Sequence, residues 1–272
     1  MATTAPLDAD AGAAARTVGY FALWRVLWRS FFFQSATNYE RMQNVGFAYC
    51  MLPALTRLYR GDALQAAMTR HLEFFNSHPY MADALLGASI KLEEQIAAGR
   101  LPPAAVQRFK RCMMGPMAAI GDSFFWSSLK PFGAAWAIAG VLSGIAWAPL
   151  AFLVLYNMFH LSMRVYGLFA GYQYGERVVE QLNRFELPRF SDRSHYLAGA
   201  FLGIGAALLA DDAMRSTAAI GDGLEPVLMV LLAVIFLLCL KRKMPMLLLL
   251  YGFAAACVGL VCGLNALFPL IG

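Results

Sequence analysis

Long apolar runs separated by charged stretches dominate the second half of the chain. Residues 131–163 contain no Asp, Glu, Lys or Arg, although glycines and prolines interrupt the run. A second apolar run covers 194–210, and a third covers 226–272 on either side of a basic turn at 241–243. A membrane-spanning helix needs about 20 mostly apolar residues. The pattern predicts one bent span or two half-spans in the first run, a tilted span in the second and a transmembrane hairpin in the third.

The first half of the chain has an amphipathic pattern instead. Trp24 and Trp28 are four residues apart and alternate with two arginines at the same spacing, which predicts a helix lying among lipid headgroups. Residues 56–111 mix both signs of charge with apolar residues and predict amphipathic helices at the interface or in the cytoplasm, broken by GRLPP at 99–103. The chain lacks the alternating period of a strand. The predicted fold class is all-α, a polytopic integral membrane protein with broken or re-entrant helices.

The same pattern predicts the domain organisation. An Ala-rich stretch at 1–18 is expected to be a disordered tail, and 19–272 a single membrane domain. Within that domain we expect an amphipathic helix plus a polar-cluster hairpin at 19–55, an amphipathic helical region at 56–111, and a broken helix followed by transmembrane helices at 112–272.

Composition strengthens the membrane assignment. Apolar residues make up 60% of the 272 residues and charged residues 14%, whereas soluble domains contain about 25% charged residues. A soluble enzyme is therefore excluded. The net charge of +5 is scattered along the chain, which suits membrane lipid headgroups and does not suggest a nucleic-acid partner.

Loop charges predict the orientation of the chain. Basic loops tend to stay in the cytoplasm, so the Lys-Arg-Lys turn at 241–243 is expected there and the C-terminus outside. Counting backward, the acidic loop at 211–225 is external and the arginine-containing segment at 177–193 is cytoplasmic.

A polar cluster, NYERMQN at 38–44, interrupts an otherwise apolar stretch. On a helix, Glu40, Gln43 and Asn44 would share a face, with Asn38 on a neighbouring one. Ionisable groups at membrane depth are costly and usually face protein or a water-filled cavity. Two interpretations stay open. One is a knot of hydrogen bonds between helices or an interfacial pair of Glu40 with the following arginine, and the other is a polar wall around a hydrophilic substrate.

A second cluster, MGPMAAIGDSFFWSSLKP, covers 114–131. Its Gly-Pro pair predicts a helix break, and Gly121 permits close approach of the backbone. Asp122 and Ser123 are suited to cap a new helix. Broken helices whose free ends face a polar ligand are typical of transporter sites, and a simple capped loop is the alternative.

The segment HLEFFNSHP at 71–79 contains two histidines but predicts no metal site. His71 and His78 lack a nearby third ligand, and Pro79 favours the end of a helix. The chain also lacks a nucleophile–base pair or a phosphate-binding loop, so neither a cofactor nor catalysis by this chain alone is expected.

Three blocks together resemble a known family. They are WRSFFFQSATNYERMQNVGFAYCMLPAL at 28–55, MTRHLEFFNSHPYMADALLG at 68–87 and MMGPMAAIGDSFFWSSLKP at 113–131. The chain is similar over about residues 20–270 to the IID component of the mannose/fructose/sorbose family of the sugar phosphotransferase system (PTS). Two departures from the family pattern bear on substrate preference: Glu93 and Glu94 stand in place of three acidic residues, and Lys-Arg-Cys at 110–112 in place of an apolar stretch.

The resemblance implies a multi-pass subunit of the bacterial inner (plasma) membrane. It would pair with a IIC membrane subunit, commonly as a trimer of IIC–IID pairs, to translocate a hexose. Cytoplasmic IIA and IIB domains would relay phosphate from phosphoenolpyruvate to the sugar. The phosphoryl-carrying histidines belong to those partners, so this chain is expected to be a transport subunit that is not phosphorylated.

A hexose removed from water needs hydrogen-bond partners for its hydroxyls, each unpaired one costing about 1–3 kcal/mol. The predicted substrate contacts are Asn38, Glu40, Gln43, Asn44, Gly121, Asp122 and Ser123, with Asn76, His78 and Trp126 in supporting positions. Three alternatives stay open: an assembly scaffold that does not touch sugar, an orphan regulatory membrane protein with the same fold, and a membrane enzyme.

Overall fold

The structure, a computed structural model, describes residues 17–216 and scattered residues between 231 and 255. Contacts divide the chain into two units, Met1–Leu209 and Ala210–Gly272, and the fold below is that of the first. The predictions of a disordered tail, of a hairpin at 226–272 and of an external C-terminus fall almost entirely outside the described residues.

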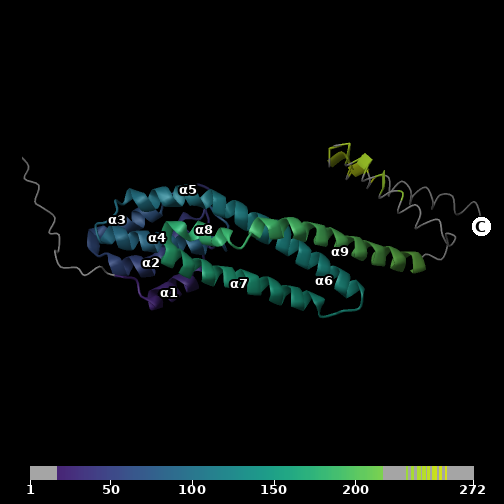
Figure 1. The fold of residues 1–272 in the computed structure, drawn as a ribbon, viewed down its shortest axis with the longest axis horizontal. Helices are drawn as coiled ribbons and strands as arrows, with labels where there is room; N and C mark the ends of the chain where they lie inside the picture. Colours follow the sequence, from purple (N-terminus) through teal and green to yellow (C-terminus); the bar gives the residue numbers. More distant parts are fainter. Residues whose placement is uncertain are drawn as a thin grey trace, which may run out of the picture. The chain divides into compact units, whose positions relative to one another are not determined.

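All regular structure in the 17–216 stretch is helical (Figure 1). The helices are α1 (Tyr20–Ser30), α2 (Asn44–Leu58), α3 (Gly61–His71), α4 (Ala82–Ala97), α5 (Ala104–Gly121), the π-helix η1 (Asp122–Leu129), α6 (Lys130–Leu142), α7 (Ala148–Tyr174), the 3-10 turn η2 (Gly175–Arg177), α8 (Val178–Asn183) and α9 (Leu187–Ser216). Within that stretch, extended pairing is limited to two isolated bridges, Asn38 with Met42 and Met42 with Phe75. The all-α prediction is confirmed.

Helix α1 has the predicted amphipathic form. Leu23, Val26 and Leu27 are buried, while Trp24 and Trp28 are 53% and 68% exposed. The guanidinium of Arg29 lies 4.5 Å from the centre of the Tyr49 ring on α2. Aromatic rings and arginines on the outer face are typical of a helix at a membrane or protein interface.

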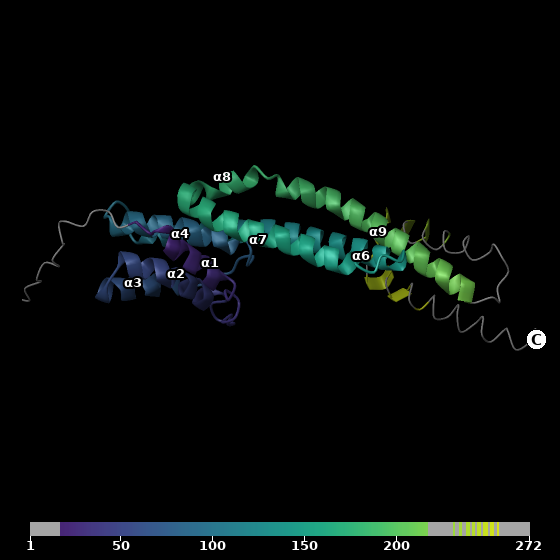
Figure 2. The ribbon, with the colours of Figure 1, turned by 90° about the horizontal axis from the view of Figure 1, so that it is seen from below.

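Small residues bring α4 and α7 into close contact, and these helices lie side by side in Figure 2. A Cβ atom on Gly171 of α7 would lie 2.2 Å from the carbonyl oxygen of Ala84, and one on Gly87 would lie 2.1 Å from that of Leu168. Most of α4 is buried, so this part of 56–111 is a core helix instead of an amphipathic surface helix. It can be buried because its carboxylates have partners within the protein.

The predicted helix break in the 114–131 cluster is wrong. Helix α5 continues through Pro116 to Gly121, and η1 and α6 follow it without a gap. Asp122 has helical backbone angles (φ −62°, ψ −44°), whereas the residue that caps the start of a helix has a non-helical backbone. A proline inside a helix removes one backbone donor but can be tolerated when neighbouring helices hold the chain. The irregularity appears six residues later, as the wide turns of η1.

The uncharged run at 131–163 forms a helical hairpin. Helices α6 and α7 pack together on either side of a turn at 143–147, where Gly144 has a positive φ of 85°. Among the described residues, one continuous helical stretch, Ala148–Leu182, is long and apolar enough to cross a membrane. Helix α9, which contains the second predicted run, runs beside α6, with the rings of Phe132 and Phe201 5.9 Å apart.

Candidate functional site

The polar cluster at 38–44 forms a turn, and only Asn44 belongs to a helix. The Asn38 side-chain amide donates to Asn44 Oδ1 at 2.9 Å, and the Asn44 amide donates to the carbonyl oxygen of Leu72 at 2.8 Å. Gln43 Oε1 accepts the backbone N–H of Ser77 at 2.9 Å. The expectation of one shared helical face is therefore wrong, because these amides satisfy backbone groups of the neighbouring turn instead.

Glu40 stands apart from these amides. Its side chain is 80% exposed and pairs with Arg41, whose side chain is 53% exposed, at 3.3 Å. Asn76 is also exposed. The first interpretation from the sequence, a hydrogen-bonded knot with an outer Glu40–Arg41 pair, fits this geometry, while a sugar wall would need a surface supplied from outside the chain.

His78 and the Gly121 region form the second part of the predicted site. A Cβ atom on Gly121 would lie 2.3 Å from His78 Cγ, so only glycine allows the imidazole to lie against α5. The imidazole stacks on Phe125 at 5.2 Å and contacts the half-exposed ring of Trp126 at 4.9 Å. Asp122, which follows Gly121 in the sequence, is exposed.

Ser123 points to a different neighbour. Its hydroxyl lies 3.0 Å from the hydroxyl of Ser191 on α9, and Ser191 also contacts Ser128. The Nε2 atom of His195 lies 3.3 Å from the Ser128 hydroxyl and 2.9 Å from the carbonyl oxygen of Ser127. Ser123 therefore ties η1 to α9 and is separate from the amides of the first cluster.

The three blocks that carry the family resemblance meet at residues 75–78. Gln43 bonds to Ser77, and the adjacent His78 fits against Gly121. The segment between α3 and α4 thus joins the first block to the third. The three blocks, although far apart in the sequence, therefore contact one another in the fold.

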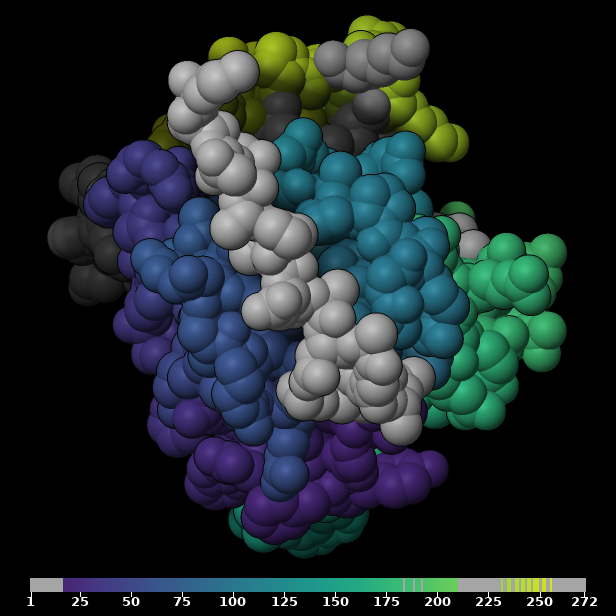
Figure 3. Space-filling view, turned by 90° about the vertical axis from the view of Figure 1, so that its left-hand side faces the viewer, coloured from purple at the N-terminus to yellow at the C-terminus, as the bar shows by residue number. Residues whose placement is uncertain are grey.

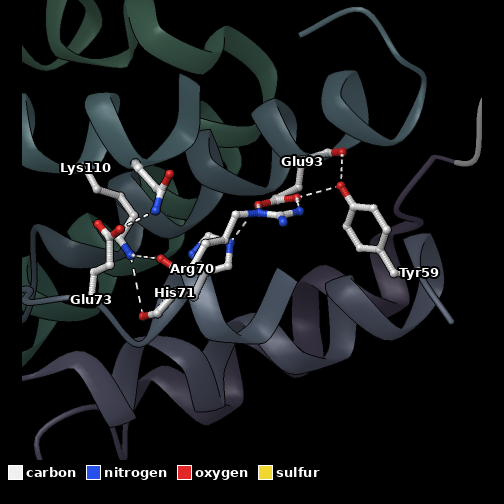
Figure 4. A network of polar contacts seen from close by, with 7 residues as sticks. Tyr59, Arg70, His71, Glu73, Glu93 and Lys110 are labelled. Carbon is white, nitrogen blue, oxygen red and sulfur yellow. Dashed lines mark hydrogen bonds and ion pairs between the residues drawn. The ribbon is translucent and has the colours of Figure 1, made fainter. Parts of the chain in front are cut away.

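A buried polar network around Glu93, shown in Figure 4, was not predicted from the sequence. Glu93 of α4 accepts two hydrogen bonds from the Arg70 guanidinium, both at 2.7 Å, one from the Tyr59 hydroxyl at 2.7 Å, and one from His71 Nε2 at 2.9 Å. The Glu93 side chain is fully buried, and that of Arg70 is 10% exposed. Both carboxylate oxygens are saturated, which makes burial of this charge tolerable.

Burial and hydrogen bonding shift the pKa values of Glu93 and His71 in opposite directions. Burial raises the pKa of Glu93, but the hydrogen bonds from Arg70 and His71 outweigh it and bring that pKa to about 2. Burial lowers the pKa of His71 to about 4, with the Glu93 hydrogen bond opposing it. His71 is therefore neutral at pH 7 and donates its Nε2 proton to a charged Glu93.

Lys110 completes the network from α5. Its ammonium lies 3.5 Å from the carbonyl oxygens of Arg70 and His71 and 4.6 Å from the centre of the Phe47 ring. Burial lowers its pKa to about 8, while Glu73 and Glu93 oppose that shift. The Lys-Arg-Cys departure at 110–112 thus inserts a cation beside the Glu93 cluster.

Titration of His71 predicts a measurable pH effect. Because its pKa falls from 6.5 to about 4 on folding, its contribution to stability is complete above pH 6.5 and is lost as the pH falls toward 4. We expect His71→Gln to flatten the fall in unfolding temperature between pH 6.5 and pH 4. Thermal unfolding in detergent, followed by tryptophan fluorescence, measures it. His195→Gln is the control, and equal slopes in all three proteins would refute the assignment.

A second missed pair lies near the base of the α6–α7 hairpin. Arg164 Nη1 lies 3.2 Å from Asp83 Oδ2 and donates to the carbonyl oxygen of Ser30 at 2.9 Å. Arg164 Nε donates to His160 at 3.0 Å. A single arginine at the end of a long uncharged run is a signal for such a pair, since charges on apolar helices usually have partners inside the protein.

The two histidines of the 71–79 segment have different surroundings. His71 belongs to the Glu93 network, and His78 packs among aromatic rings. Within the described part of the chain, no three His, Cys, Asp or Glu side chains are grouped as metal ligands.

An all-α fold with a long, exposed apolar helix, in which Glu93 and Arg164 are buried with partners inside the protein, is typical of a helical membrane protein. The family model described as "PTS system mannose/fructose/sorbose family IID component" matches residues 20–265. This chain belongs to that family. The family predicted from the three sequence blocks is thereby confirmed.

Individual relatives agree with the family. The mannose-specific EIID component of Escherichia coli is 38% identical over 175 residues, which are 63% of this chain and 62% of the relative. The fructose permease IID component of Bacillus subtilis is 34% identical over 171 residues, covering 62% of each chain. The alignments therefore span less than two thirds of these relatives. A chain in the solved complex of the mannose transporter ManYZ with microcin E492 is 30% identical, with a TM-score of 0.57, over 91% of this chain and 98% of that one.

Proposed function

We propose that this chain is the IID membrane subunit of a PTS sugar transporter. It forms the translocation unit with a IIC subunit and takes up a hexose of the mannose/fructose/sorbose class. The IIB domain phosphorylates the sugar during uptake, with phosphate supplied through IIA. The observation that carries the proposal is the family match over residues 20–265. In the proposed setting, a bacterial inner membrane, IIC–IID pairs associate as trimers and the C-terminus is external.

The exposed polar residues support a site shared with IIC. Glu40, which pairs with the half-exposed Arg41, and Asp122 are both exposed, so their carboxylates can face a partner or a ligand between subunits. Asn38, Gln43 and Asn44 brace the turn behind Glu40 through the bonds described above. We infer that the wall around the sugar is divided between the two subunits, and that this chain alone binds sugar poorly.

Loss of either exposed carboxylate tests this arrangement. We expect Glu40→Gln and Asp122→Asn to lower mannose uptake by about tenfold or more, because a charged acceptor for a sugar hydroxyl is lost. Uptake of labelled mannose is measured in cells that lack their own IID but contain IIC, IIB and IIA. The exposed Glu180→Gln is the matched control, and co-purification with IIC checks assembly. Wild-type uptake by both variants would remove these carboxylates from the mechanism.

One observation favours a second candidate, an assembly scaffold that does not contact sugar. The amides of Gln43 and Asn44 already have partners within the chain. A scaffold predicts that Gln43→Leu and Asn44→Leu fail to co-purify with IIC. A sugar-contacting role predicts that carboxylate variants assemble normally and fail only in uptake.

A further inference from the structure

A polar cavity outside the candidate sugar site lies between α4, α5 and the end of α7. Its volume is about 420 Å³, within the range of about 300–1,000 Å³ typical of small-ligand sites. Its charged lining consists of Lys91 from α4, Arg108 from α5, and Glu176 and Arg177 from η2. On the face shown in Figure 3, the α5 surface (teal) borders green residues of the segment that follows α7.

The cavity has an excess of positive charge. Three cations and one carboxylate line it, a net charge of +2. Within the described part of the chain, neither Arg108 nor Arg177 lies within ion-pair distance of a carboxylate, whereas Lys91 pairs with Glu94 at 3.1 Å. Two guanidinium groups are thus available to an anion.

Local backbone geometry brings these groups together. Helix α7 ends at Tyr174, and Gly175 follows with φ +59°, a backbone conformation that residues other than glycine rarely adopt. The chain turns there and places Arg177 on the same cavity as Arg108. Lys91 is held in place by Glu94 and lies 5.2 Å from the centre of the Tyr172 ring.

A second polar cavity provides a comparison. It lies between α3 and α5, and two arginines and two carboxylates line it: Arg41, Arg70, Asp62 and Glu73. Its charges balance, and Arg70 is already bound to Glu93. Only the first of these two cavities has the unpaired positive charge that an anion requires.

The uncharged residues that line the cavity indicate which chemical groups the anionic ligand carries besides its charge. Gln95 and Gln173 supply amide donors and acceptors suited to hydroxyl groups, and Leu92, Leu101 and Ala105 offer apolar contact for a C–H surface. Arginine forms paired hydrogen bonds with phosphate oxygens. We propose that this cavity binds a phosphorylated sugar, the product of the uptake reaction. This inference rests on the proposed function for its ligand and on the expected cytoplasmic location of 177–193 for its side of the membrane.

The test is a titration of the full chain in detergent with mannose 6-phosphate, inorganic phosphate and mannose. We expect mannose 6-phosphate to bind more tightly than either of the others. The double variant Arg108→Gln/Arg177→Gln should weaken binding about tenfold for each arginine. Glu176→Gln should strengthen it about two- to threefold, because a repelling charge is removed. Arg57→Gln, an exposed arginine outside the cavity, should leave it unchanged.

Several outcomes would overturn the assignment. Wild-type binding by the double variant would place the ligand elsewhere, and inorganic phosphate binding as tightly as mannose 6-phosphate would exclude a sugar site. Parallel mannose uptake separates the two proposals. A chain that supports uptake but binds no mannose 6-phosphate refutes only the cavity assignment, whereas a chain without uptake refutes the transport function.

Discussion

Replacing Glu93 by glutamine is expected to lower the free energy of unfolding by about 3–5 kcal/mol, the usual cost of removing one partner of a buried ion pair. The substitution removes the charge opposite Arg70, whose side chain is 10% exposed. It also replaces an oxygen acceptor by an amide donor among the donors of Tyr59 and His71. The guanidinium would remain buried without a counter-charge.

Denaturant or thermal unfolding of the full chain in detergent measures this loss. Glu73→Gln is the matched control, because Glu73 pairs with Arg111 near the surface, where the side chains are 29% and 64% exposed. Exposed pairs contribute about 0–1 kcal/mol, so the control should change stability little. Similar losses in both variants would show that burial of the Glu93 network has no special importance.

Replacing Gly171 by valine is expected to prevent α4 and α7 from packing as they do. Because an added Cβ would meet the backbone oxygen of Ala84 at 2.2 Å, whole helices must separate to relieve the clash. We expect a loss of about 3 kcal/mol or more, above the usual range for overpacked cores, since no side-chain rotation can relieve it.

The amount of folded protein extracted from membranes, together with its elution as a single species in detergent, measures this effect. Gly115→Val on α5 is the control, because an added Cβ there has no neighbour within 4 Å. Normal yield and elution of the Gly171 variant would contradict the close approach of the two helices.

Local patterns in the sequence predicted much of the fold. The spacing of Trp24 and Trp28 marked α1, GRLPP at 99–103 marked the gap before α5, and the uncharged run at 131–163 marked the α6–α7 hairpin. The Gly-Pro pair at 115–116 led to the wrong prediction of a helix break. The proline does remove a hydrogen bond from α5, but packing against neighbouring helices offsets that cost, and such packing is visible only in the tertiary structure. The π-helical turns of η1 have no comparable signal in the sequence.

The candidate site was predicted less completely. The sequence motifs directed attention to Gly121 and His78 but could not show that they contact each other, since that pairing depends on how the helices pack. Gln43 and Asn44 were recognised as buried polar groups, yet their partners are backbone atoms, which have no sequence signature. Glu93 was noted only as a departure from a family pattern.

The uneven burial of α7 has a mechanical consequence. Its buried residues other than Ala148 lie between Arg164 and Gly171, where α4 holds the helix, and the preceding stretch is largely exposed. Arg164 lies 16 positions after Ala148, which corresponds to a rod of about 24 Å at 1.5 Å per residue. A rotation of about 10° at the fixed end would swing the tip by about 4 Å. Small rearrangements beside Asp83 would thus be amplified into displacements of several ångströms at the tip of the α6–α7 hairpin.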